Sequence, residues 1–174
     1  LRRGDPGYPA RLAATTDAPP VLFVRGNVEV LELPAIAIVG ARDASDAGRV
    51  RARRLARLLA ERGIAVASGL ARGIDTAAHR GALEAAGITF AVIGTPLTRC
   101  YPNENADLQH RIGQVGAVVS QFAPSSKTRP SCFPMRNATM SGLTLATVVV
   151  EASENSGSLM QARKALEQGR KLFI

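Results

Sequence analysis

The stretch AIAIVG at residues 35–40 decides the fold class of this sequence. Five apolar residues followed by a glycine are typical of a strand that is covered on both faces of a sheet. Ser45 can then cap the N-terminus of a helix, in which apolar residues recur at helical spacing from Ala52 to Leu59. The stretch therefore predicts the first strand and helix of an α/β domain.

The alternation of strand and helix continues along the rest of the chain. We expect further strands at 64–67, 88–93, 117–121, 145–151 and 171–174. We expect helices at 74–86 and 104–115, from 134 onward, and from 156 to 168. This order predicts an α/β fold with a mostly parallel sheet and helices on both faces. Folds of this kind bind ligands beyond the carboxyl ends of their strands.

Residues 1–34 precede this alternation and have a different pattern. The apolar run at 21–24 predicts a short strand, and a short helix is expected at 10–15. We expect an N-terminal arm and first strand at 1–34, packed on one domain at 35–174. Because residue 1 is not Met and the sequence ends within a strand pattern, we interpret the chain as a fragment without its flanking domains.

The composition is globular and strongly basic. Hydrophobic residues make up 46% of the chain, and 22 Lys and Arg outnumber 14 Asp and Glu to give a net charge of +8. A basic surplus favours polyanionic partners, especially nucleic acid. The alternative, that the base composition of the genome enriches alanine and arginine, stays open at this point.

Metal, cofactor and membrane binding are not predicted. Cys100 and Cys132 form no CxxC pair and have no adjacent His/Cys cluster, so neither a zinc site nor a disulfide is expected. No stretch approaches the roughly 20 apolar residues of a membrane span. We expect a cytoplasmic protein with no metal, no cofactor and no membrane partner.

The loop after the first buried strand places Gly40 and Arg42 at the start of a helix. Glycine allows close backbone approach, and a helix N-terminus favours an anion. The spacing is neither GxGxxG nor a P-loop, so dinucleotide binding of the usual kind is disfavoured. The alternative is an ordinary tight turn with an exposed arginine.

The loop at 68–75 again joins a strand to a helix. Gly69 and Gly73 can expose backbone N–H groups as a nest for an anion, and Arg72 lies between them. We interpret Asp75 as a structural acid in the first helical turn. The loop therefore indicates a second anion site on the same rim.

Two later loops carry further signals for nucleic acid. Phe133 lies in a polar segment after Lys127, and an aromatic ring beside cations suits single strands, because bases stack on the ring. Ser156, Gly157 and Ser158 open the last helix, where hydroxyl and N–H groups can bind phosphate. The alternatives are a Phe133 that anchors its loop to the core and serines that simply cap the helix.

The most basic segment is the helix after Ser45. Arg49, Arg53 and Arg57 line one of its faces at i, i+4 and i+8. We interpret this face as a solvated outer surface rather than a track for DNA.

The motifs together resemble the bacterial DNA-processing protein A family, also called Smf. The matching segments are Ala37 to Arg42, Ser68 to Asp75 with Ala78-His79, Tyr101-Pro102 with Asn105, Phe133-Pro134 with Arg136-Asn137 and Ser141-Gly142, and Ser156 to Leu159. The resemblance covers nearly the whole chain, from Tyr8-Pro9 onward. It implies an extended Rossmann-like fold that binds single-stranded DNA, loads the RecA recombinase in natural transformation and recombination, and forms a homodimer.

The resemblance also implies roles for individual residues, in DNA binding and not in catalysis. Arg42 would contact a phosphate, Phe133 would stack on a base, and the others would shape the pocket or donate hydrogen bonds. The implied DNA-binding residues are Gly40, Arg42, Ser68, Gly69, Arg72, Gly73, Phe133, Arg136, Asn137, Ser156, Gly157 and Ser158.

The sequence departs from the family pattern at four positions. Ala41, Pro96, Ala138 and Gln161 stand where Ser, Gly, Arg and Thr, respectively, are usual. A missing arginine removes one phosphate contact. These departures concern the geometry of individual contacts and leave the resemblance intact.

Two other functional classes remain as alternatives. Nucleoside-monophosphate hydrolases of the LOG group resemble this fold but use a PGGxGT loop with a following acid, whereas residues 151–159 hold one glycine. Glu151 and Glu154 are the acids nearest this loop, and His79 is interpreted as structural. The second alternative is a protein-interaction scaffold whose basic charge is incidental.

Overall fold

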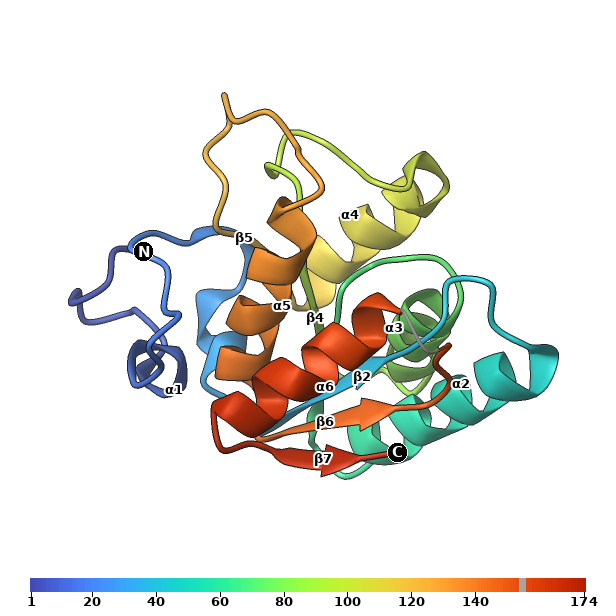
Figure 1. Ribbon diagram of the computed structural model, residues 1–174. Coiled ribbons are helices and arrows are strands. Elements are labelled where there is room, and N and C mark those ends of the chain that lie inside the picture. Colours follow the sequence, from blue (N-terminus) through green and yellow to red (C-terminus); the bar gives the residue numbers. More distant parts are fainter. Residues whose placement is uncertain (154–155) are drawn as a thin grey trace.

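A seven-stranded sheet forms the centre of the computed structural model, which describes residues 1–153 and 156–174 (Figure 1). The strand order is β1-β5-β4-β3-β2-β6-β7. Every neighbouring pair is parallel except β1 and β5, which are antiparallel. The strands are β1 (Phe23–Gly26), β2 (Ala35–Val39), β3 (Ala65–Ser68), β4 (Thr89–Val92), β5 (Ala117–Ser120), β6 (Ala146–Val149) and β7 (Lys171–Phe173).

Helices cover both faces of the sheet. They are α1 (Ala10–Ala13), α2 (Asp46–Ala60), α3 (Ile74–Glu84), α4 (Ala106–Val115), α5 (Cys132–Leu143) and α6 (Gly157–Glu167), with short 3-10 turns η1 (Val28–Leu31) and η2 (Asn103–Asn105). In β2, Ala37 and Val39 pack in the core below α1, α5 and α6, whereas Ile38 packs against α2 and α3. The predicted α/β fold with a mostly parallel, doubly covered sheet is confirmed.

Small residues bring α2 and α3 close together. Ala52 and Ala56 of α2 are buried against Ala77 and Ala78 of α3. A Cβ on Gly81 would lie 2.2 Å from the carbonyl oxygen of Arg53, so only glycine fits there. The two helices therefore form one closely packed pair behind the sheet.

Residues 1–34 share a core with the rest of the chain. Leu12 of α1 and Leu22 belong to the same buried cluster as Phe90 of β4 and Met140 of α5. The strand expected at 21–24 runs instead from Phe23 to Gly26, because pairing with β5 sets its limits. The predicted division at residue 34 stays a prediction.

Other element limits shift by only a few residues. α5 begins at Cys132, so Pro134 lies inside its first turn, where the missing N–H of proline needs no partner. Ser45 caps α2 as predicted, and its Oγ accepts the N–H of Gly48. Within residues 1–153 and 156–174, the helices are too short or too polar to cross a membrane.

Candidate nucleic-acid interface

The loops that follow β2, β3, β4 and β6 lie on one rim of the sheet and enclose two adjoining pockets. The first pocket has a volume of about 620 Å³ and is bordered by α5 and α6. The second has a volume of about 430 Å³ and is bordered by the loops after β3 and β4. Both pockets are lined by Arg42, Asp43, Ala71, Phe133 and Arg136, and we call these five residues the rim junction.

An arginine and two aromatic rings meet at the rim junction. The guanidinium carbon of Arg42 lies 5.8 Å from the centre of the Phe133 ring, within the range of a cation–π contact. The Tyr101 ring centre lies 5.8 Å from that of Phe133, with the rings inclined at 52°. Tyr101 is 55% exposed, and Arg42 is also exposed. The cation and the rings are therefore accessible to a ligand.

Arg136 has the opposite environment. It is only 7% exposed, and its Nη1 donates to the carbonyl oxygens of Gly69 at 2.6 Å and Val92 at 2.7 Å. Its Nε donates to Oδ1 of Asn137 at 3.0 Å. Burial lowers the pKa of Arg136, and the carboxylate of Asp75 acts against this effect. Arg136 therefore fastens β3 to β4 and places a fixed positive charge at the base of both pockets.

The N–H groups of the loop after β3 already have an anionic partner. The carboxylate of Asp75 accepts hydrogen bonds from the N–H of Gly69 at 3.1 Å and of Ala71 at 3.3 Å. Burial raises the pKa of Asp75, while the Arg136 cation and these N–H groups oppose the rise. The expected anion nest between Gly69 and Gly73 is therefore corrected, because a carboxylate of the chain itself occupies it.

Asn105 holds the same loop from the other side. Its Nδ2 donates to the carbonyl oxygen of Leu70 at 2.9 Å and to Oγ1 of Thr76 at 3.0 Å. Leu70 has a φ of 60°, a left-handed conformation that costs an L-residue about 1–2 kcal/mol. The hydrogen bonds of Asn105 offset this cost and fix the wall of the second pocket.

The start of α6 forms the opposite wall of the first pocket. The hydroxyl oxygens of Ser156 and Ser158 are 2.7 Å apart, and Ser156 makes no side-chain capping bond to the helix. Nδ2 of Asn137 donates to the carbonyl oxygen of Gly157 at 3.2 Å. All four residues line this pocket, so α5 and α6 present hydroxyl and backbone groups to it together.

Two predicted glycines allow close approach at the base of the pockets. A Cβ on Gly40 would lie 2.5 Å from Cγ1 of Ile74, and a Cβ on Gly69 would lie 2.2 Å from Nη1 of Arg136. Gly40 lines the first pocket and Gly69 the second. Both therefore shape the pockets through the absence of a side chain.

Of the three remaining predicted residues, only Arg72 lines one of the two rim pockets. Ser68 is fully buried and donates to the carbonyl oxygen of Ile38 at 2.6 Å, so it joins two strands below the pockets. Gly73 lines neither pocket; its φ of 71° lets the chain turn beside the backbone of Arg42. Arg72 lines the second pocket and pairs with Glu104 at 2.8 Å. We therefore assign Ser68 a structural role instead of the expected DNA contact, whereas a DNA contact of Gly73 stays a prediction.

Glu151, the acid at the end of β6, has structural partners. Both carboxylate oxygens of Glu151 accept hydrogen bonds from Ser45, one from its N–H at 2.9 Å and one from its Oγ at 2.6 Å. These bonds lower the pKa of Glu151. Glu151, at the end of β6, thus anchors the loop that contains Arg42. Glu154 and Asn155 lie outside the described residues.

Among the residues that line the pockets, Tyr101 and Gln161 were not predicted to bind DNA. Tyr101 lines the second pocket beside Phe133, and its signal was the scarcity of aromatic residues in this chain. Gln161 lines the first pocket while only 1% exposed, and its Oε1 has no hydrogen-bond partner in the described part of the chain. No pattern in the sequence places Gln161 there.

Metal coordination finds no support among the described side chains. Residues 1–153 and 156–174 contain no group of three His, Cys, Asp or Glu side chains placed to hold an ion.

The sequence matches the DNA recombination-mediator protein A family over residues 1–174. It is 41% identical over 169 residues to DNA processing protein DprA of Streptococcus pneumoniae, covering 97% of this chain and 60% of that protein. It is 44% identical over 167 residues to protein Smf of Escherichia coli, covering 95% of this chain and 45% of that protein. The chain thus spans less than two thirds of the length of these curated relatives.

Solved structures of DNA processing protein A have the same fold as this chain. An X-ray structure of DprA from S. pneumoniae matches with a TM-score of 0.94 and 40% identity, over 99% of this chain and 60% of that one. A Helicobacter pylori DNA processing protein A structure, which concerns a single-stranded DNA binding mode, matches with a TM-score of 0.88 and 28% identity, over 95% and 76% of the two chains. A molybdenum cofactor binding protein of Rippkaea orientalis shares the fold alone, at a TM-score of 0.60 and 17% identity over 80% and 74% of the two chains.

Proposed function

Because this chain belongs to the DNA recombination-mediator protein A family, we propose that it binds single-stranded DNA in the two rim pockets, without catalysis. The observation that carries the proposal is the cation–π contact between Arg42 and Phe133 where the two pockets meet. A nucleobase can stack on the exposed parts of Phe133 and Tyr101, while the Arg42 guanidinium meets the adjacent phosphate. The H. pylori relative, described by its single-stranded DNA binding mode, supports this choice of ligand.

The base of the pockets suits a backbone that carries negative charge. Arg136 lies below both pockets, and Ser156 and Ser158 present hydroxyl groups at the wall of the first. Stacking on aromatic rings and contact with phosphates do not distinguish one base from another, so we expect weak sequence preference and a steep fall of affinity with salt.

The hydrolase alternative is disfavoured by the state of Glu151. A general acid or base needs a carboxylate that is free to exchange a proton with substrate. Both oxygens of Glu151 are engaged by Ser45, and these bonds hold its pKa low. Release of adenine from AMP by the purified chain would contradict the binding proposal directly.

The test is a fluorescence-anisotropy titration of end-labelled oligothymidylate with the wild type, Arg42→Ala and Phe133→Ala. Loss of one stacking contact weakens binding by about 1–3 kcal/mol, so the dissociation constant of Phe133→Ala should rise at least about fivefold. Phe173→Ala is the matched control, because Phe173 is 53% exposed on the edge strand β7 and lines none of the rim pockets. Its affinity should equal that of the wild type.

Two outcomes of this titration would contradict the proposal. If neither Arg42→Ala nor Phe133→Ala weakens binding, the rim is not the DNA site. If the wild type binds no oligonucleotide but binds a protein partner tightly and independently of salt, the chain is an interaction scaffold.

We also propose the dimerisation and the RecA loading that the family resemblance implies. A cytoplasmic homodimer would present two rims to one strand and load RecA onto it. Sedimentation equilibrium measures the dimer, and the rate of RecA filament formation on single-stranded DNA measures loading. A monomer at micromolar concentration, or an unchanged filament rate, would contradict these two points separately.

A further inference from the structure

A third pocket continues from the rim along the outer side of α2 and α3. It has a volume of about 580 Å³ and shares Arg72 and Glu104 with the second rim pocket. Its walls come from α2, from the loop before α3, from α3 itself and from η2. Since Gly81 locks α2 against α3, the distance between these walls is fixed. We call this third pocket the arginine groove.

Cations outnumber anions in the arginine groove. Arg49 and Arg53 enter it from α2, Arg80 from α3 and Arg72 from the loop between β3 and α3. The lining acids are Asp46 and Glu104. Arginines from α2 and from the continuous segment formed by the loop after β3 and α3 therefore converge on one surface next to the rim.

The pairing of these arginines leaves hydrogen-bond donors for a ligand. Arg49 pairs with Asp46, Arg53 with Glu84 and Arg72 with Glu104, whereas Arg80 has no ion pair within the described part of the chain. These pairs are half-exposed, and exposed pairs contribute only about 0–1 kcal/mol. A guanidinium has five N–H donors, more than one carboxylate accepts, so a phosphate can bind beside the carboxylate or replace it.

We propose that the arginine groove is a second, sequence-independent contact for single-stranded DNA, which holds the phosphates of the strand as it leaves the rim pockets past Arg72. This inference rests on the proposed function, because it needs a strand in the rim. It assigns a binding role to one face of α2 that the sequence alone indicates to be merely solvated. In the groove, Val50 and Ala77 are the apolar lining residues and no aromatic side chain is present among those described, so the contact is to phosphate and not to bases.

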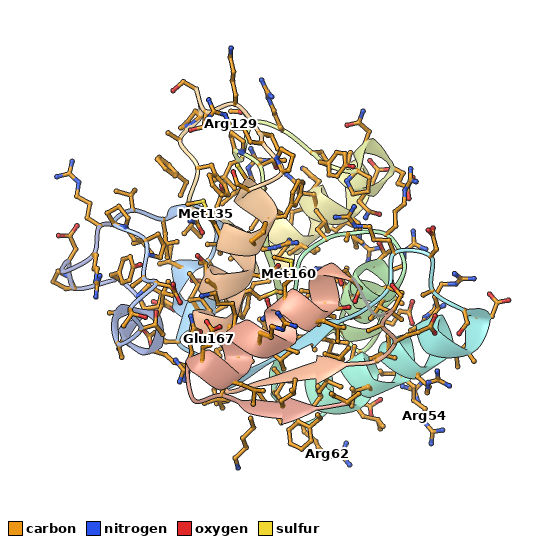
Figure 2. All side chains as sticks on the ribbon, in the orientation of Figure 1. Arg54, Arg62, Arg129, Met135, Met160 and Glu167 are labelled. Carbon is orange, nitrogen blue, oxygen red and sulfur yellow. The ribbon has the colours of Figure 1, made fainter. Side chains whose placement is uncertain are left out.

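The experiment compares two charge-matched double variants on two lengths of DNA. Arg49→Gln/Arg80→Gln removes a cation from each wall of the groove. Arg54→Gln/Arg62→Gln removes two cations from the α2 region outside all three pockets, where both side chains extend into solvent (Figure 2). Anisotropy is measured on oligothymidylates of about 6 nucleotides, near the lower end of the usual site sizes of single-strand binders, and of about 20 nucleotides, beyond their upper end.

If the arginine groove binds DNA, the affinity that Arg49→Gln/Arg80→Gln loses depends on the length of the DNA. On the longer strand, Arg49→Gln/Arg80→Gln should weaken binding about tenfold near physiological salt and lower the slope of log K against log salt by about 1.4, since each phosphate contact contributes about 0.7. On the shorter strand it should bind like the wild type, and Arg54→Gln/Arg62→Gln should do so on both.

Each possible result supports or contradicts either the arginine groove or the rim site. Equal losses for both double variants on the longer strand would show a general charge effect and overturn the groove. An unchanged affinity of Arg49→Gln/Arg80→Gln on the longer strand would overturn it too, while tight binding of the shorter strand still supports the rim. If neither strand binds the wild type, the proposed function itself fails.

Discussion

At the scale of single residues, the same side-chain type has opposite roles in one site. Arg42 and Arg136 were both predicted to contact DNA, yet Arg42 is exposed and Arg136 is buried with three hydrogen bonds to Gly69, Val92 and Asn137. Sequence could place both near the rim, because both follow recognisable motifs. It could not separate them, because the carbonyl groups that accept hydrogen bonds from Arg136 belong to Val92 and Gly69, 44 and 67 positions away in the chain.

The interpretation of His79 as structural has a consequence for stability. Its ring is fully buried with Nδ1 2.7 Å from Oγ1 of Thr89, and burial, reinforced by the Arg136 cation, lowers the pKa of His79 to about 3. The pKa in the folded chain is thus below the unfolded value of about 6.5. The neutral ring stabilises the fold fully above pH 6.5, and this contribution is lost as the pH falls towards 3.

We predict that His79→Leu reduces the acid sensitivity of the protein. Between pH 6.5 and pH 5 the free energy of unfolding of the wild type should fall by up to about 1.4 kcal/mol per pH unit more than that of the variant. Urea unfolding at several pH values measures the difference, with the exposed His110→Asn as the control. The NMR shift of the His79 ring gives a second readout in the wild type: a titration midpoint above pH 5 would contradict the prediction.

At the scale of elements, strands and helices were predictable and loop geometry was not. The strand at Ala35 and the cap at Ser45 follow from local patterns of apolar and capping residues. The loop after β3 does not, because Asn105, which is 35 positions from Leu70, fixes its wall. Contacts of this range depend on how the strands are ordered in the sheet, which the sequence pattern leaves open.

The start of α2 provides a prediction at this scale. Ser45→Ala removes the capping bond to the N–H of Gly48 at 3.0 Å and the bond to Oε2 of Glu151. We expect the free energy of unfolding to fall by about 1 kcal/mol, as is typical for a lost N-cap, and we expect weaker DNA binding because the Arg42 loop loses an anchor. Urea unfolding and anisotropy measure the two effects.

The control for the cap is another serine at a helix start. Ser131 precedes α5 but makes no side-chain capping bond, so Ser131→Ala should leave the stability nearly unchanged. If the two variants lose the same amount, the capping bond of Ser45 contributes nothing specific.

At the scale of the whole molecule, some of the basic side chains line the pockets and others lie outside them. The net charge of +8 alone could not distinguish a DNA-binding surface from a compositional bias. The structure separates arginines that line the three pockets from those, such as Arg54 and Arg62, that lie outside them. The fold class was predictable because the alternation of strands and helices extends over most of the chain. The sharing of one core by residues 1–34 and the sheet was not, because it depends on packing against α5.

This shared core predicts that the arm and the sheet unfold together. Leu12 is fully buried, and Gly142 of α5 leaves it space, since a Cβ at Gly142 would lie 2.4 Å from Cδ1 of Leu12. Leu12→Ala should therefore lower the free energy of unfolding of the entire chain by about 2–5 kcal/mol, whereas the partly exposed Leu33→Ala should have a small effect. In a Tyr101→Phe background, the fluorescence of Tyr8 reports on the arm and far-UV circular dichroism on the helices. If the Tyr8 fluorescence and the circular dichroism change at the same urea concentration, both with Leu12 and with Leu12→Ala, the arm and the sheet form one cooperative unit. If the Tyr8 fluorescence changes at a lower urea concentration than the circular dichroism, the arm is a separate unit docked on the sheet.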